Sequence, residues 1–151
     1  MTQEQLRIAI NALFNALENE VKTYETSPED WNICQGNVAV CLITDDGDSY
    51  GRFFGHDKLL QRASYATAYK KASQVWITGY HTNDYEKMVF DGQVDPEEFS
   101  PIELPDLIGW LGGQRLQMSD TITVSVGFSG FRGFNDVKIV KDAWERIKDS
   151  F

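Results

Sequence analysis

The chain has 151 residues, 42% of them hydrophobic, and its 14 basic and 23 acidic residues give a formal net charge of −9. This size fits one domain, residues 1–151, with a core of its own, and the negative charge argues against nucleic acids and anionic membrane surfaces as partners. The first residues do not resemble a signal peptide and no apolar run approaches ~18 residues, so we expect a cytoplasmic protein without a membrane span. Cys34 and Cys41 lie in no metal-binding motif, so we expect no metal site.

The N-terminal segment predicts one long amphipathic helix. Thr2 and Gln5 have the spacing of a capping box, in which each side chain bonds the backbone N–H of the other residue. Behind them, apolar residues recur at helical spacing from Leu6 onward. We expect this helix to end before Ser27-Pro28.

A β-hairpin is predicted next, with strands at residues 37–44 and 49–54. The first strand is a short apolar run, and Asp46-Gly47 is a strong signal for the turn. The neighbouring carboxylates Asp45 and Asp48 lack the further ligands and the closing glutamate of a calcium loop. A hairpin turn accounts for them fully.

A second long helix is predicted over residues 59–76, with a stop at Gly79. Its expected apolar face consists of Tyr65, Ala68, Tyr69, Ala72 and Trp76. A cluster of basic residues surrounds this helix: Arg52, Lys58, Arg62, Lys70 and Lys71. We interpret the cluster as a solvated face, the alternative being a receptor for the carboxylates of a small anionic ligand.

Residues 80–110 give the weakest pattern. Asp95-Pro96 resembles a helix N-cap followed by proline at the first helical position, and Gly112-Gly113 predicts a turn. Residues 121–128 alternate between apolar and polar side chains, which predicts a half-buried strand. After a glycine-containing loop at residues 129–133, Asp136 predicts the cap of a last helix.

This order of elements predicts the α+β class. We expect an antiparallel sheet of about five strands flanked by helices, three of them long and with their apolar faces turned inward.

Three segments together resemble the haem-degrading-domain family, which includes glycolate-operon G-type proteins and a haem-binding sensor. They are the hairpin at residues 38–55 with its Asp-Asp-Gly turn, the spacing S-x-x-x-A-x-x-K-A at Ser64, Ala68, Lys71 and Ala72, and the order Gly112-Gly113, Gly127-Phe128-Ser129-Gly130, Asp136. The chain departs from the family at Gly55-His56-Asp57, where an M-D-G-like turn is usual, and at Arg115, where a proline is expected.

The resemblance implies a profilin-like sheet and self-association into a homo-oligomer. It implies binding of haem or a related tetrapyrrole for some members, and it transfers no catalytic residue to this chain. The number of aromatic side chains, 13% of the chain, agrees with subunit interfaces because these favour Tyr, Trp and Phe.

The candidate ligand-binding residues lie in three irregular segments that follow strands or contain glycine. They are Arg52, His56 and Asp57; Gly112, Gly113 and Arg115; and Ser129, Gly130, Phe131, Arg132 and Phe134. Loops at the ends of elements concentrate binding residues, and glycines let backbone approach a ligand closely. The arginines could hold a carboxylate and the phenylalanines could cover an apolar body; the competing interpretation is a set of ordinary turns.

No residue is assigned a catalytic role. Ser129 lacks the second glycine of a nucleophile elbow, since Phe131 occupies that position. His56 and His81 are the only imidazoles, and either could serve a reaction or bind haem iron.

Three functions stay open at this level. The first is a non-enzymatic, oligomeric protein that binds a small molecule, either haem, another tetrapyrrole or a small anionic ligand. The second is an enzyme acting on haem or a small organic acid through His56 or Ser129. The third is an assembly scaffold without a small ligand.

Overall fold

The computed structural model describes residues 1–99 and 109–151 of the chain. Its elements, in chain order, are α1 (Gln3–Thr23), η1 (Tyr24–Thr26), α2 (Pro28–Cys34), β1 (Ala39–Thr44), β2 (Ser49–Phe53), α3 (Lys58–Thr78), α4 (Thr82–Phe90), η2 (Pro96–Phe99), β3 (Gly113–Gln117), β4 (Thr123–Ser129), α5 (Gly133–Ile147) and η3 (Lys148–Ser150). The predicted α+β class is confirmed, and α1, α3 and α5 are the three long helices.

All strand pairs in the sheet are antiparallel, and the order is β2-β1-β4-β3. The central pair sets Val40 opposite Phe128 and Leu42 opposite Val126. Within the described residues the sheet has four strands, not the predicted five. Its profilin-like topology stays a prediction.

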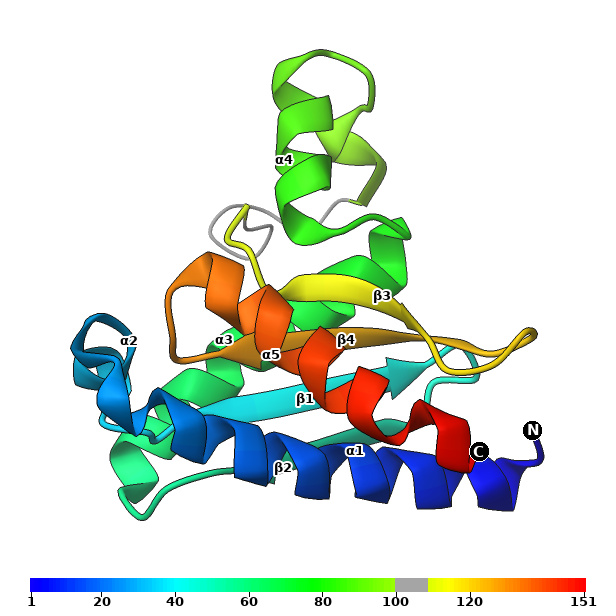
Figure 1. The fold of residues 1–151 in the computed structure, drawn as a ribbon. Coiled ribbons are helices and arrows are strands. Elements are labelled where there is room, and N and C mark those ends of the chain that lie inside the picture. Colours follow the sequence, from blue (N-terminus) through cyan, green and yellow to red (C-terminus); the bar gives the residue numbers. More distant parts are fainter. Residues whose placement is uncertain (100–108) are drawn as a thin grey trace.

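Helices cover both faces of this sheet (Figure 1). On one face, α1 and α5 pack together over a large apolar core that includes Leu13, Leu17, Val126 and Phe128. On the other face, α3 lies across β1 and β4, and its apolar cluster is small. Figure 1 also shows α4 standing away from the sheet.

Several local predictions are confirmed. The capping box joins Thr2 and Gln5, and α1 ends before Ser27. Gly47 in the hairpin turn and Gly79 at the end of α3 both have positive φ values, +91° and +77°. Asp95 accepts a hydrogen bond from the Glu97 N–H, as a cap before Pro96 requires, although the element that follows is a 3-10 helix.

Two expectations, about α5 and about α3, need correction. Asp136 is not the cap of α5, because Gly133 opens the helix three residues earlier and Arg132 occupies the N-cap position. Tyr69 and Trp76 do not share the buried face of Ala68 and Ala72, since their side chains are 52% and 43% exposed.

The sequence patterns also missed α2, α4 and β3. The predicted turn at Gly112-Gly113 is half right, because Gly112 lies in a turn whereas Gly113 is the first residue of β3.

Candidate functional site

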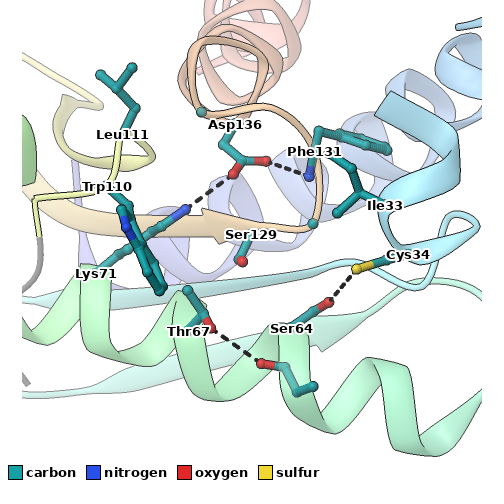
Figure 2. A pocket seen from close by; sticks show the side chains of 13 residues that line it. Ile33, Cys34, Ser64, Thr67, Lys71, Trp110, Leu111, Ser129, Phe131 and Asp136 are labelled. Carbon is teal, nitrogen blue, oxygen red and sulfur yellow. Dashed lines mark hydrogen bonds and ion pairs between the residues drawn. The ribbon is translucent and has the colours of Figure 1, made fainter. Parts of the chain in front are cut away.

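A cleft of about 400 Å³ opens where α2, α3, the segment before β3 and the β4–α5 loop meet (Figure 2). Its lining residues are Ile33, Cys34, Ala63, Ser64, Thr67, Lys71, Trp110, Leu111, Ser129, Gly130, Phe131, Gly133 and Asp136. Four large apolar side chains, from Ile33, Trp110, Leu111 and Phe131, provide most of the bulk of the walls. Polar groups lie deeper, on α3, at the end of β4 and in α5.

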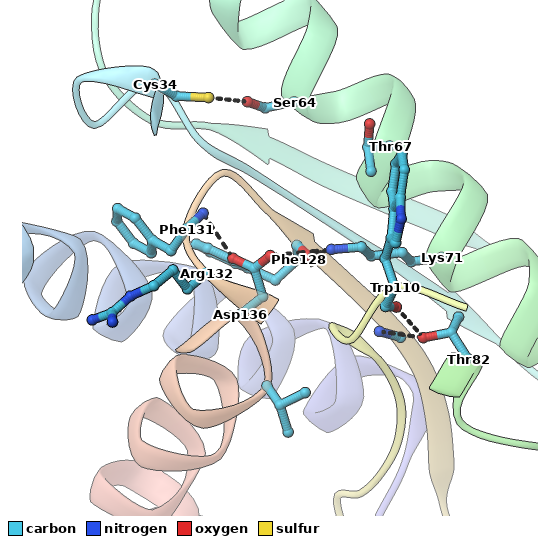
Figure 3. Close-up of polar contacts among 12 residues, drawn as sticks. Cys34, Ser64, Thr67, Lys71, Thr82, Trp110, Phe128, Phe131, Arg132 and Asp136 are labelled. Atoms are coloured by element: carbon cyan, nitrogen blue, oxygen red, sulfur yellow. Dashed lines mark hydrogen bonds and ion pairs between the residues drawn. The ribbon is translucent and has the colours of Figure 1, made fainter. Parts of the chain in front are cut away.

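The deepest polar feature is a buried ion pair between Lys71 of α3 and Asp136 of α5 (Figure 3). Lys71 Nζ lies 3.1 Å from Asp136 Oδ2 and donates a second hydrogen bond, 2.9 Å long, to the Phe128 carbonyl. The other carboxylate oxygen accepts the Phe131 N–H at 2.9 Å. These four residues tie α3 to the end of β4 and to the first turns of α5.

Burial shapes the electrostatics of this pair. Each side chain is 3% exposed, and burial raises the pKa of Asp136 to about 7, against the lowering effect of Lys71 and of the Phe131 N–H. A carboxyl group in such surroundings exchanges its proton near neutral pH. Perturbed groups of this kind gather at functional sites, although structural ion pairs produce them too.

A second polar chain forms the wall on the α2 side. The Ser64 hydroxyl donates to the Asn37 carbonyl at 2.7 Å, so its single proton is used there. Cys34 Sγ lies 3.7 Å from the same hydroxyl oxygen, which places the thiol as the donor of that contact. Cys34 is partly exposed and lines the cleft.

The position of α2 depends on Asp30, which is buried. Its carboxylate accepts hydrogen bonds from the Arg132 backbone, the Arg132 guanidinium, Asn135 and Ser27. Burial alone would raise the pKa of Asp30, but the hydrogen bonds from Arg132 and Asn135 outweigh it and hold the pKa below its ordinary value. This cluster fixes α2 against the start of α5, and so fixes the cleft between them.

The structure brings some of the predicted site residues together in this cleft. Ser129, Gly130 and Phe131 line it. Gly112 adjoins it, because a Cβ added there would lie 2.7 Å from Lys71 Nζ. Gly113 lies next to that point and donates its N–H to the Thr82 hydroxyl.

Other predicted residues lie elsewhere. His56 and Asp57 line a separate hollow near the end of α1, together with Trp31 and Phe53. Phe134 is half exposed, with the Arg132 guanidinium 4.7 Å from the centre of its ring.

The three predicted arginines do not converge on one point. Arg52 donates to Asn11 and Asn15 of α1. Arg115 pairs with Asp45 at the β1–β2 turn. Arg132 pairs with Asp30 and Glu29 of α2. Each guanidinium has partners of its own on a different element, so the described chain does not combine them into one carboxylate receptor.

Sequence reasoning missed Cys34, Lys71 and Asp136 as residues of the cleft. By sequence alone Lys71 resembles a solvated cation and Asp136 a helix cap, yet both belong to the family-like pattern. Ser64, Lys71 and Asp136, far apart in that pattern, all line the same cleft. The pattern itself was therefore the signal that could have located the site.

Across residues 1–99 and 109–151, no three His, Cys, Asp or Glu side chains gather in a way that could hold a metal ion. Over the same residues, no helix combines the length and the apolar character that crossing a membrane requires.

The fold is similar to several solved structures. The PduOC:haem complex superposes with a TM-score of 0.67 at 17% identity, covering 95% of this chain and 91% of that one. HbpS gives a TM-score of 0.59 at 16% identity, with 91% and 87% covered. The Klebsiella pneumoniae protein ORFY gives 0.64 at 15% identity, with 95% and 90% covered.

No protein-family model and no curated protein sequence matches the chain. The resemblance to the haem-degrading-domain family is confirmed by these neighbours at the level of the fold.

Proposed function

We propose that the protein binds a small molecule with an apolar body in the cleft between α2, α3 and the β4–α5 loop. The observation that carries this proposal is the composition of the cleft: large apolar side chains form its walls, and its buried charges already neutralise each other. Ligand sites are typically concave and mostly apolar, with a few polar groups that fix orientation. The volume of about 400 Å³ lies in the range usual for such sites.

Haem is the first ligand to test. The fold is shared with a protein solved as a haem complex, and Cys34 offers a thiol, a group that can bind haem iron as a thiolate. In this arrangement Cys34 would hold the iron, and Ile33, Leu111 and Phe131 would contact the apolar ring. Bound haem would supply iron chemistry; the chain itself would supply the ligand and the apolar surroundings.

The residues of the cleft favour an apolar ligand over two alternatives, which are a small anionic ligand and an enzymatic reaction. Lys71 is the only cation among the described lining residues and is committed to Asp136, which argues against a ligand held by a free carboxylate. Ser129 lines the cleft without a histidine beside it among those residues, which argues against a serine nucleophile activated by imidazole.

A haem titration followed by absorbance tests the proposal. We expect the wild-type protein to saturate with one haem per chain. Ala63→Phe should weaken binding at least tenfold, because Ala63 is an exposed residue of α3 whose enlarged side chain would fill the cleft without disturbing the core. Cys34→Ser should change the absorbance spectrum of the bound haem, since it removes the proposed iron ligand.

His56→Ala is the matched control, because His56 lies in the other hollow. This variant should bind haem as the wild type does. Haem binding that survives Ala63→Phe and Cys34→Ser but disappears in His56→Ala would move the site out of the cleft. Thermal melting curves of all three variants show whether each remains folded.

A further inference from the structure

The outward face of α3 carries a stripe of residues with heptad spacing. The stripe consists of Leu59, Arg62, Ala66, Tyr69, Ser73 and Trp76, at intervals of three and four residues. It lies opposite the face with which Ser64, Ala68 and Lys71 contact the sheet, and Leu59 is 80% exposed. Intervals of this kind define the seam by which one helix packs along another.

The centre of the stripe is complementary in size to itself when one copy is reversed. In an antiparallel helix pair, each a position faces a d position of the other helix. A twofold axis between residues 67 and 68 sets Leu59 opposite Trp76 of the partner subunit, and Ala66 opposite Tyr69 of the partner subunit. A large side chain thus meets a small one at the centre, as close packing between helices requires.

We propose that two copies of this chain associate through antiparallel packing of their α3 helices along this stripe. Twofold symmetry is the commonest form of self-association, and it needs a surface that is complementary to itself. The proposal concerns an interface and does not depend on the ligand proposed for the cleft.

Charge selects both the direction and the register of the pair. Between residues 58 and 78, α3 contains basic residues and no acidic ones. A parallel pair would place Arg62 beside its own copy, whereas the antiparallel pair separates the two by 11 residues, about 16 Å, which exceeds the screening length of about 8 Å at physiological salt. Arg62 would then lie near the rings of Tyr69 and Trp76 of the partner subunit, an attractive arrangement for a cation.

The neighbouring antiparallel register, shifted by one heptad, is less favourable. It would set Ala66 opposite Trp76 of the partner subunit and bring the two copies of Lys70 within about 3 Å along the axis. The register proposed here keeps them five residues apart. Lys70 also has an interaction within its own chain.

Disulfide cross-linking tests the geometry directly. In a Cys34→Ser background, we expect a mixture of the Leu59→Cys and Trp76→Cys chains to form a mixed disulfide on mild oxidation. Neither chain alone should cross-link, because the copies of each residue are 17 residues apart along the pair, about 25 Å.

Cross-linking of either chain with itself would indicate a parallel pair. A mixed disulfide between Ala66→Cys and Trp76→Cys, with none between Leu59→Cys and Trp76→Cys, would indicate the shifted register. Both results would overturn the proposal.

Light scattering provides the second measurement, since the mass of one chain is 17.2 kDa. We expect the wild-type protein to have twice this mass at micromolar concentration and Trp76→Glu to have the mass of one chain. The matched control is Ile8→Glu, which places the same charge at a half-exposed apolar residue of α1 and should leave the dimer intact. A monomeric wild type, or a Trp76→Glu variant that remains dimeric, would overturn the proposal.

Discussion

On one face of the sheet, α1 and α5 bury branched and aromatic side chains, whereas on the other face α3 approaches the strands through alanine and glycine. The first face has a core that includes Ile10, Leu13 and Phe128, each at most 2% exposed. On the second face, a Cβ at Gly127 would clash with the Ala68 carbonyl oxygen and lie 2.6 Å from the Ala72 nitrogen. The helix and strand backbones are therefore in near contact.

Close approach on the α3 face brings polar groups into positions that a thick apolar layer would forbid. Lys71 reaches the Phe128 carbonyl and the Asp136 carboxylate because Gly127 of β4 and Gly112 before β3 leave room for its side chain. On the same face the Tyr65 hydroxyl contacts Cys41 Sγ at 3.7 Å. Burial raises the pKa of Cys41, and burial with this contact raises the pKa of Tyr65 to about 12. The α1/α5 face thus contributes apolar burial, and the α3 face contributes specific contacts and the cleft.

The largest expected effect is the loss of the buried ion pair. Lys71→Met should destabilise the protein by about 3–5 kcal/mol at neutral pH, because the charged form of Asp136 loses its cation and the Phe128 carbonyl loses its hydrogen-bond donor. Chemical denaturation at pH 7 measures the change. The double variant Lys71→Met/Asp136→Asn is the control: it removes both charges and should recover part of the loss. If the single and double variants are equally unstable, the cost arises from packing and not from an uncompensated charge.

A smaller but still large effect is expected where α3 touches the strand. Gly127→Ala should cost about 3 kcal/mol, since the added methyl group would meet backbone atoms, which cannot rotate away. Urea denaturation measures the loss. The matched control is Gly79→Ala at the end of α3, where nothing lies within 4 Å and only the positive φ of +77° opposes the change, at about 1 kcal/mol. Equal losses at the two sites would contradict the close contact.

The two faces also differ in how well the sequence predicted them. Apolar periodicity located α1, the hairpin, β4 and α5, because a face that buries large side chains produces a regular pattern. On α3, the same rule placed Tyr69 and Trp76 inside with Ala68 and Ala72. Only the alanines face the sheet, since a strand surface containing Gly127 admits only small side chains.

The candidate site was predicted in part for a related reason. Ser129, Gly130 and Phe131 follow a clearly patterned strand and were found, whereas Cys34 lies on α2, a helix of seven residues without a periodic signal. The sequence left open whether the arginines converge or belong to ordinary turns, because a position in a loop does not determine where a side chain finds its partner. Periodicity and charge alone do not distinguish Lys71 from an exposed lysine, because its burial depends on the partner Asp136, which is 65 residues away in the sequence.

The smallest expected effect is a pH dependence that separates the two faces, since the α1/α5 core contributes little charge. The pKa of Asp136 is about 7 in the folded chain against an ordinary value of 3.8. Between these values the folded protein retains a proton that the unfolded chain has lost, so this group's contribution to stability is complete below about pH 4 and disappears as the pH rises through 7. The charged groups that act on it are Lys71 from α3 and Asp30 from α2.

The slope from one group is at most about 1.4 kcal/mol per pH unit. Denaturation at pH 5, 6 and 7 should therefore show stability falling for the wild type and a flatter profile for Asp136→Asn. The opposite shift of Asp30, whose pKa is lowered, removes stability only at pH values below about 4 and leaves this window clear. Identical profiles for the two proteins would mean that Asp136 keeps its charge across the whole range, held by Lys71 against the effect of burial.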